Sequence, residues 1–147
     1  AENYNANAAS GKYAYVISAP TNLTNYNLPS TDVPALQHFR LVYESTTYVV
    51  GGYLTSADGG GTAYVKTFEY VPGAVIRGEG TIEVEVITNN GRTFTYRQES
   101  VNGQFIVPYS TSGSTYDVKT TGLYTIIETG QTFAVSEDAV LKGLTIN

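Results

Sequence analysis

The segment GAVIRGEGTIEVEVITNNGRTFTYRQESVNGQFIVP, which runs from Gly73 to Pro108, determines the predicted fold. Apolar and polar residues alternate on both sides of the turn residues Asn89, Asn90 and Gly91, as in two β-strands with one buried face. The segment contains no cluster of catalytic or metal-binding residue types. It therefore predicts a β-hairpin within a β-rich domain and gives no indication of chemistry.

The turn of this hairpin can be assigned from the pairing that it imposes on the two strands. A two-residue Asn90-Gly91 turn would place Val86 opposite a polar residue, whereas a three-residue Asn89–Gly91 loop places it opposite Phe94. Directly paired residues share a face, so the three-residue loop is predicted, with Gly91 in the left-handed conformation. The predicted buried face consists of Ile82, Val84, Val86, Phe94 and Tyr96.

Short β-rich segments continue on both sides of the hairpin. They are Lys12–Ser18, Phe39–Glu44, Thr46–Leu54, Ala63–Val71, Phe105–Val107, Thr115–Thr120, Leu123–Glu128 and Gln131–Val135. Gly51-Gly52 indicates a bulge or bend inside one of them, and Ser56–Thr62 indicates a flexible loop. One helix is predicted over Ser136–Lys142, capped by Ser136 and ended by Gly143. Eight or more closely spaced strands predict an all-β antiparallel sandwich or barrel.

The chain is expected to form one domain, because its 147 residues suffice for a single sizeable core. Residues 1–11 are small and polar and predict an N-terminal arm. Residues 12–147 then form the single β domain, which includes an irregular Pro/Asn-rich loop at residues 19–34. A chain that begins at Ala1 without methionine fits the product of signal-peptide cleavage, so an exported protein is expected.

Composition excludes several classes of function. The chain has 8 Lys and Arg residues and a net charge of −5, so no basic patch is available for nucleic acid. No apolar run approaches the roughly 20 residues that span a bilayer, so no transmembrane segment is predicted. Only 14% of the residues are charged, against about 25% in typical soluble domains. Such a neutral surface favours packing against copies of the same protein.

No catalytic, cofactor-binding or metal-binding residue is predicted, and the chain is expected not to be an enzyme. His38 is the one histidine and there is no cysteine, so His38 is interpreted as a half-buried strand residue. Glu83 and Glu85 share a strand face, which could suit a pair of glycosidase acids, but the solvated face of an amphipathic strand is favoured. Asp58–Thr62 lacks the P-loop and EF-hand patterns and is interpreted as a flexible loop.

Two features suggest an exposed, interacting protein. Asn22-Leu23-Thr24 is an N-x-[ST] sequon in the Pro-rich loop, which makes Asn22 the candidate site for an N-linked glycan. The 13 tyrosines could form a carbohydrate platform or a protein interface, and the interface is favoured.

Three segments of the chain resemble the β-rich C-terminal region of archaeal oligosaccharyltransferases. They are HFRLVYES (His38–Ser45), VKTFEYVPGAVIRGEG (Val65–Gly80) and NGQFIVPYST (Asn102–Thr111). Their G-A-x-I-x-G…G-x-F-x-V-P rhythm is also similar to transthyretin-like, or carboxypeptidase-regulatory-like, sandwiches. The resemblance covers about residues 36–147 and implies a β-sandwich with one short C-terminal helix.

The same resemblance limits the chemistry that can be expected. Catalysis in the family uses acidic motifs of the membrane part and a W-W-D-Y-G motif of the soluble part. This chain has no tryptophan and no membrane span, so no catalytic residue of the family can be carried over. The resemblance implies a peripheral, non-catalytic accessory domain.

Three functions remain open on this basis. The favoured one is a secreted structural glycoprotein that polymerises with copies of itself into an archaeal cell-envelope layer, such as a methanogen sheath, an S-layer or a filament. It would lie at the cell surface and assemble through strand edges and Tyr-rich interfaces. The alternative is the accessory domain of an archaeal oligosaccharyltransferase, and the third is a carbohydrate-binding module.

Overall fold

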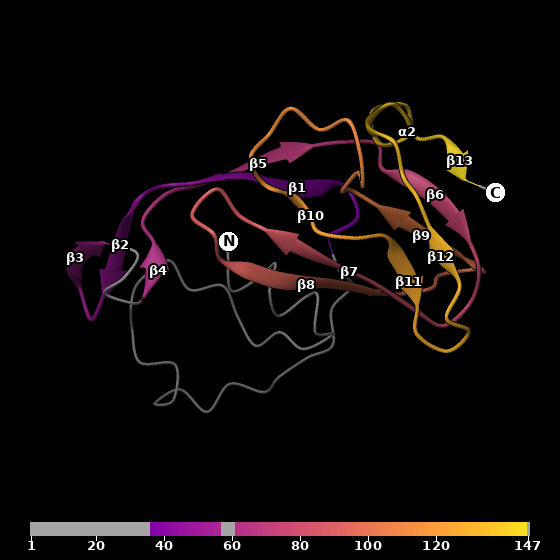
Figure 1. The fold of residues 1–147 in the computed structure, drawn as a ribbon, viewed down its shortest axis with the longest axis horizontal. Helices are drawn as coiled ribbons and strands as arrows, with labels where there is room; N and C mark the ends of the chain where they lie inside the picture. Colours follow the sequence, from indigo (N-terminus) through magenta and orange to yellow (C-terminus); the bar gives the residue numbers. More distant parts are fainter. Residues whose placement is uncertain (1–35, 57–60, 147) are drawn as a thin grey trace.

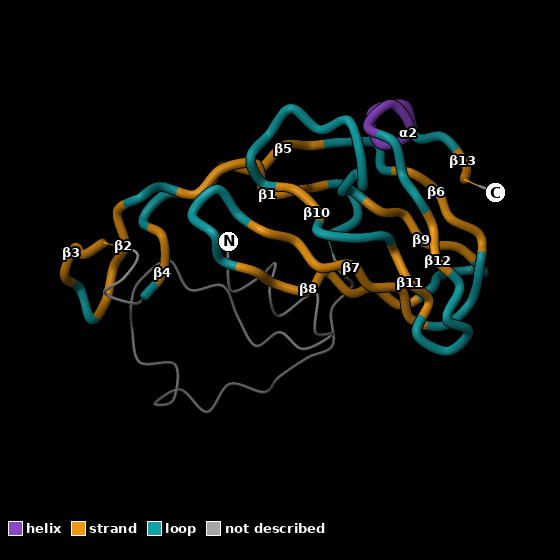
Figure 2. The backbone as a smooth tube through the Cα atoms, viewed as in Figure 1, coloured by secondary structure: helices purple, strands orange, loops and turns teal. Residues whose placement is uncertain are grey.

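The computed structural model describes residues 36–56 and 61–146 (Figure 1). The predicted arm at residues 1–11, the predicted strand Lys12–Ser18 and the loop with the candidate glycosylation site Asn22 lie outside the described residues. Strands dominate the described part, and loops connect most of them directly (Figure 2). The predicted all-β class with one short helix near the C-terminus is confirmed.

The elements follow one another as short strands with one helix among the described residues. They are β1 (Phe39–Glu44), β2 (Thr47–Val50), β3 (Tyr53–Ser56), β4 (Thr62–Ala63), β5 (Lys66–Tyr70), β6 (Ala74–Arg77), β7 (Thr81–Ile87), β8 (Thr93–Glu99), β9 (Gln104–Val107), β10 (Lys119–Thr120), β11 (Tyr124–Ile126), β12 (Thr132–Phe133), α2 (Glu137–Lys142) and β13 (Thr145–Ile146).

Backbone hydrogen bonds group these strands into four sheets. The largest is built around β7, which pairs with β8 on one side and with β10 and β11 on the other, and β12 extends it beyond β11. A second sheet has the order β13-β6-β9, a third is the β1–β5 pair, and the fourth has the order β3-β2-β4. The pairs are antiparallel except β13–β6, which is parallel.

The central hairpin has the register that its alternation predicts. Val86 pairs with Phe94, and Val84 pairs with Tyr96. The Thr88 N–H donates to Arg92 O at 2.8 Å, and the Gly91 N–H donates to Thr88 O at 2.9 Å, which closes the three-residue loop. Gly91 has φ +80°, the left-handed value that this loop requires. The predicted inward face is buried except for Phe94, which is half-buried.

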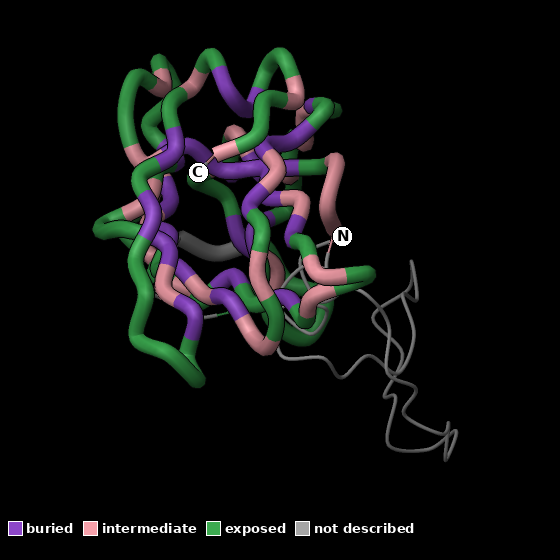
Figure 3. Tube along the Cα trace, turned by 90° about the vertical axis from the view of Figure 1, so that its right-hand side faces the viewer, coloured by how far each residue is buried: buried purple, intermediate pink, exposed green. Residues whose placement is uncertain are grey.

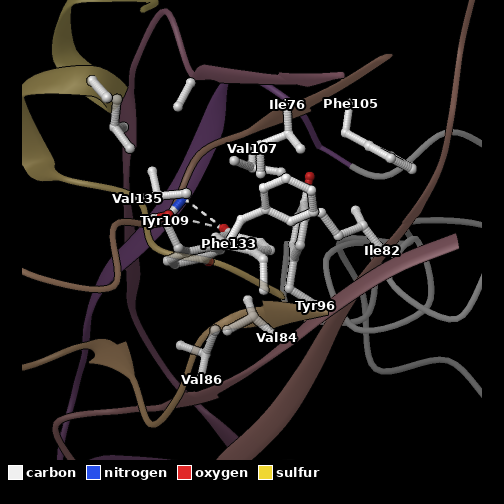
Figure 4. Packing of buried hydrophobic residues seen from close by; sticks show 14 of the residues in the cluster. Ile76, Ile82, Val84, Val86, Tyr96, Phe105, Val107, Tyr109, Phe133 and Val135 are labelled. Atoms are coloured by element: carbon white, nitrogen blue, oxygen red, sulfur yellow. Dashed lines mark hydrogen bonds between the residues drawn. The ribbon is translucent and has the colours of Figure 1, made fainter. Parts of the chain in front are cut away.

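The hydrophobic core lies between the β6–β9 pair and the strands around β7 (Figure 4). Buried and exposed residues alternate along several of these strands, as the two-residue period of a strand requires (Figure 3). Helix α2 contributes Ala139 and Val140 to the same core. Its ends are as predicted: Ser136 Oγ accepts from the Ala139 N–H at 3.2 Å, and Gly143 is left-handed with φ +67°.

Two tyrosines of the core use their hydroxyl groups to satisfy buried backbone groups. The Tyr124 hydroxyl donates to Tyr109 O at 2.9 Å and accepts from the Tyr109 N–H at 3.2 Å. The Tyr109 hydroxyl accepts from the Leu41 N–H at 2.9 Å. Tyr124 thereby holds the chain after β9 in place, and Tyr109 links that chain to β1.

Replacing Tyr124 with phenylalanine is expected to lower the free energy of unfolding by about 1–3 kcal/mol, because the buried backbone groups of Tyr109 lose the hydroxyl that satisfies them. Urea unfolding of the 147-residue chain measures this change. Tyr116→Phe is the matched control, because Tyr116 is exposed and its hydroxyl lies 3.3 Å from Glu69. Equal losses in the two variants would contradict the interpretation.

Two predicted strands in the N-terminal half are wrong in detail. Thr46–Leu54, predicted as one strand with a bulge or bend at Gly51-Gly52, is a hairpin, in which these two glycines form the turn between Val50 and Tyr53. Both glycines have positive φ, +54° and +89°, which is the pattern of the tight turns that suit hairpins. The predicted strand Ala63–Val71 is divided into β4 and β5.

Later strands are shorter than their apolar runs predict. The backbone before β10 turns at Ser114, whose hydroxyl accepts from the Tyr116 N–H at 3.2 Å, so that only residues 119–120 pair with β7. Strand β11 ends at Ile126, where Gly130 donates back to Ile126 O at 2.8 Å. Strand β13 was not predicted, because it has two residues and no period of its own.

Candidate docking surface

A small three-stranded sheet extends from one end of the domain. It continues the β1–β5 pair, since Ser45 N–H donates to Val65 O at 2.9 Å and Tyr64 N–H donates to Thr47 O at 2.8 Å beyond the last β1–β5 pairing. We call β2, β3 and β4, together with Tyr64 and Val65, the wing. Figure 1 shows the wing at the left end of the molecule, away from the other sheets.

The wing exposes apolar side chains and carries almost no charge. Tyr53 is 80% exposed and Leu54 is 68% exposed, and Val50, Tyr64 and Val65 are exposed as well. Tyr53 and Leu54 are consecutive residues of one strand, so they lie on opposite faces of the sheet. Between residues 45 and 65 the sequence contains one charged residue, Asp58. This is the largest group of exposed apolar residues on one small sheet in the described part of the chain.

The tip of the central hairpin fastens the base of the wing to the domain. Asn89 Oδ1 accepts from the Glu44 N–H at 2.8 Å, and Asn89 Nδ2 donates to Glu44 O at 2.8 Å. Asn90 Nδ2 donates to Ser45 O at 2.9 Å and to the Tyr48 hydroxyl at 3.2 Å. These side chains take the place of a neighbouring strand, and they fix the direction in which the wing leaves the domain.

A buried ion cluster lies at the same point. Glu44 is completely buried, and its Oε1 lies 2.5 Å from Arg92 Nη2 and 3.2 Å from Lys66 Nζ. Burial, assisted by the positive charge of Arg92, lowers the pKa of Lys66 to about 7. A buried carboxylate and two basic side chains thus connect β1, β5 and the hairpin directly below the wing.

A second ion cluster joins β1 to β5 and to helix α2. Arg40 is buried and donates to both carboxylate oxygens of Glu137 and to Glu69 Oε2 at 2.8 Å. Ser110 Oγ donates to Glu137 Oε2 at 2.6 Å, and the Tyr116 hydroxyl donates to Glu69 Oε1 at 3.3 Å. The hydrogen bonds from Arg40 hold the pKa of Glu137 below its usual value. Each carboxylate oxygen of Glu69 and Glu137 accepts a hydrogen bond, so the cluster holds the elements together and leaves neither acid free for chemistry.

The structure disperses the residues that were considered as chemical candidates. His38 is half-buried just before β1, where its Nδ1 lies 3.0 Å from Pro72 O and donates to it. Glu83 forms a surface ion pair with Arg97 at 2.8 Å, and Glu85 accepts from Thr121 Oγ1 at 2.7 Å, so the two acids do not act together. Asp58 lies outside the described residues.

Residues 36–56 and 61–146 contain no group of three or more His, Cys, Asp or Glu side chains that could hold a metal ion. None of the helices found in this part of the chain has the length and apolar character that crossing a membrane requires.

The wing was missed in the sequence, although one signal of it is present there. The single charge between residues 45 and 65 is visible in the sequence, but it was interpreted as part of a uniformly neutral surface. The structure places this nearly uncharged stretch on one projecting sheet, β2 to β4.

Comparisons with known proteins show which family the chain belongs to. A model of the family described as archaeal glycosylation protein B long peripheral domain matches residues 73–146. The dolichyl-monophosphooligosaccharide–protein glycotransferase of Haloferax volcanii is 32% identical over 130 residues, and the match covers 67% of this chain and 12% of that protein. The chain therefore spans about an eighth of this relative.

Solved structures show the same fold. The oligosaccharyltransferase of Archaeoglobus fulgidus in its apo form has a TM-score of 0.61 at 23% identity, over 76% of this chain and 20% of that one. The same organism's enzyme in complex with an inhibitory peptide and a dolichol-phosphate has a TM-score of 0.61 at 21% identity, over 92% of this chain and 26% of that one.

These findings correct the favoured function. The prediction of a self-assembling sheath, S-layer or filament protein is wrong, because the family model and the relative are those of a peripheral domain and a glycotransferase. The predicted homopolymer is wrong for the same reason, and so is the location as a free structural protein at the cell surface. The resemblance to the peripheral region of archaeal oligosaccharyltransferases is confirmed.

Proposed function

Because the chain belongs to the family of archaeal glycosylation protein B long peripheral domains, we propose that it is a non-catalytic accessory domain of an archaeal oligosaccharyltransferase. The observation that carries the proposal is the family match over residues 73–146, which takes in β6 to β13 and helix α2. In this role the domain supplies a rigid β-scaffold to the enzyme, and glycan transfer takes place in other parts of that enzyme.

The internal chemistry of the domain supports the non-catalytic role. The two buried ion clusters are arranged as ties between strands, with Arg40 between two carboxylates and Glu44 between two basic side chains. A catalytic acid or base needs an open path to a substrate. Glu44 is completely buried, and both oxygens of Glu137 are engaged by donors.

A domain exchange in the Haloferax volcanii glycotransferase tests this proposal. The segment of that enzyme that matches this chain is deleted in one variant and replaced by this chain in another. We expect the deletion to lose most glycan transfer to a sequon peptide and the chimera to recover it. The 147-residue chain alone is expected to show no transfer from a dolichol-linked oligosaccharide.

Two results would contradict the proposal. Glycan transfer by the chain alone would show that the domain is catalytic. A chimera that accumulates as a folded protein but transfers no more glycan than the deletion variant would show that this chain does not serve as the accessory domain.

A further inference from the structure

We propose that the wing is a docking element that inserts into an uncharged, apolar groove on a neighbouring domain of the same oligosaccharyltransferase chain. The inference rests on the proposed function and names the partner of the surface described above. It starts from the contrast between the wing, whose side chains Tyr53 and Leu54 are 80% and 68% exposed, and the well-packed core of the remaining sheets.

The tip of the wing is uncovered on both faces, whereas Tyr48 and Ala63 nearer its base are buried. A sheet of three short strands gains its stability from a face packed against other elements. In the wing, Tyr53 projects from one face and Leu54 from the other, while Val50 and Tyr64 add apolar surface beside them. A partner that buried one face alone would leave the other in water, so a groove fits the wing better than a flat surface.

The composition of the wing indicates a protein surface. Lipid-binding elements combine apolar residues with Lys and Arg for the headgroups, and often with Trp. The segment from residue 45 to residue 65 has no Lys, Arg or Trp, and its polar side chains are mainly Thr and Ser. Tyrosine with few charges is characteristic of the buried centre of protein interfaces.

The length of the relatives indicates which partner the wing would meet. The chain corresponds to 12% of the glycotransferase and to 20–26% of the solved enzymes, so most of such an enzyme lies outside it. A covalently attached neighbour is present at a high effective concentration and needs no separate recruitment. Another domain of the same polypeptide is therefore favoured as the partner over a second copy of this chain.

The wing is also prepared for docking by its attachment. Asn89 and Asn90 hold Glu44 and Ser45 through hydrogen bonds of their side-chain amides, and the buried Glu44 cluster lies directly below. A binding element whose direction is already fixed loses less conformational entropy when it binds. The contacts at the base of the wing therefore fix the position of its apolar tip.

Hydrogen exchange tests the inference in the chimera described above and in the 147-residue chain. The wing amides are expected to exchange at least tenfold more slowly in the chimera. The double variant Tyr53→Ser/Leu54→Ser is expected to remove this protection while it leaves the melting temperature of the isolated chain unchanged. Leu123→Ser/Ile127→Ser is the matched control, because both residues are 49% exposed and lie outside the wing. It is expected to preserve the protection.

Several outcomes would overturn the inference. One is equal wing exchange in the chimera and the isolated chain. Another is protection of the isolated chain by vesicles of equal parts phosphatidylcholine and phosphatidylglycerol, which would assign the wing to lipid. A third is protection that increases with the concentration of the isolated chain, which would assign it to a second copy. A chimera that transfers glycan with an unprotected wing refutes the docking inference alone, whereas loss of transfer with a protected wing refutes the proposed function alone.

Discussion

Replacing Glu44 with alanine is expected to lower the free energy of unfolding by about 3–5 kcal/mol, the typical loss when one partner of a buried ion pair is removed. Glu44 is completely buried, with Arg92 and Lys66 at 2.5 Å and 3.2 Å from its Oε1. The variant removes the carboxylate from beside two basic side chains, and one of them, Lys66, is only 4% exposed. Urea unfolding at neutral pH measures the loss.

Glu83→Ala provides the matched control for this experiment. Glu83 is also a strand residue paired with an arginine, Arg97, at 2.8 Å, but the two side chains are 34% and 46% exposed. Exposed ion pairs contribute about 0–1 kcal/mol, so the control is expected to lose little stability. Similar losses for Glu44→Ala and Glu83→Ala would show that burial does not determine the effect.

Replacing Arg40 with methionine is expected to lower the free energy of unfolding by about 2–3 kcal/mol at pH 7, because Glu69 and Glu137 lose their shared cation. The expected cost is below that of Glu44→Ala, because the two carboxylates are partly exposed and water can reach them. The same comparison with Arg97→Met, at the surface, should give a much smaller loss.

The effect of Arg40→Met is also expected to depend on pH. Arg40 holds the pKa of Glu137 below its usual value in the folded protein. The stability that this carboxylate contributes is therefore complete above its unfolded pKa of about 4.3 and is lost as the pH falls through the lower, folded pKa. The difference between wild type and variant should be largest near neutral pH and smaller at about pH 3. A difference that does not change with pH would contradict the assignment.

The sequence predicts the central hairpin well because its constraints are local. Val84 and Val86 alternate with acids, and Asn90-Gly91 follows within a few residues, so only one register places all apolar side chains on the same face. The same holds for α2, whose cap Ser136 and terminal Gly143 are adjacent to the helix itself.

The wing could not be predicted in the same way. Gly51-Gly52 allows either a bulge within a strand or a tight turn, and the choice depends on the pairing of β2 with β4, which follows after a separate loop. The ion clusters depend on contacts between residues that are still farther apart in the sequence, such as Arg40 and Glu137, which are separated by 97 residues. Pairing over such distances leaves no periodic signal.

The favoured prediction, a self-assembling envelope protein, was wrong, whereas the family matches agree with the alternative, an accessory domain of an oligosaccharyltransferase. The low content of charge, 14% of all residues, was interpreted as a property of the whole surface and hence of a protein that polymerises. The resemblance over His38–Ser45, Val65–Gly80 and Asn102–Thr111 was the better guide, because the order of segments reflects common ancestry more directly than composition does.

The amide side chains at the hairpin tip also bear on the chemical ageing of the protein. Asparagine followed by glycine loses its amide nitrogen readily, and the chain contains this pair at Asn90-Gly91 and at Asn102-Gly103. At Asn90 the product would direct a carboxylate oxygen at Ser45 O, which now accepts a hydrogen bond from Nδ2 at 2.9 Å. The same reaction at the exposed Asn102 would leave this contact in place, because the contact is made by Asn90.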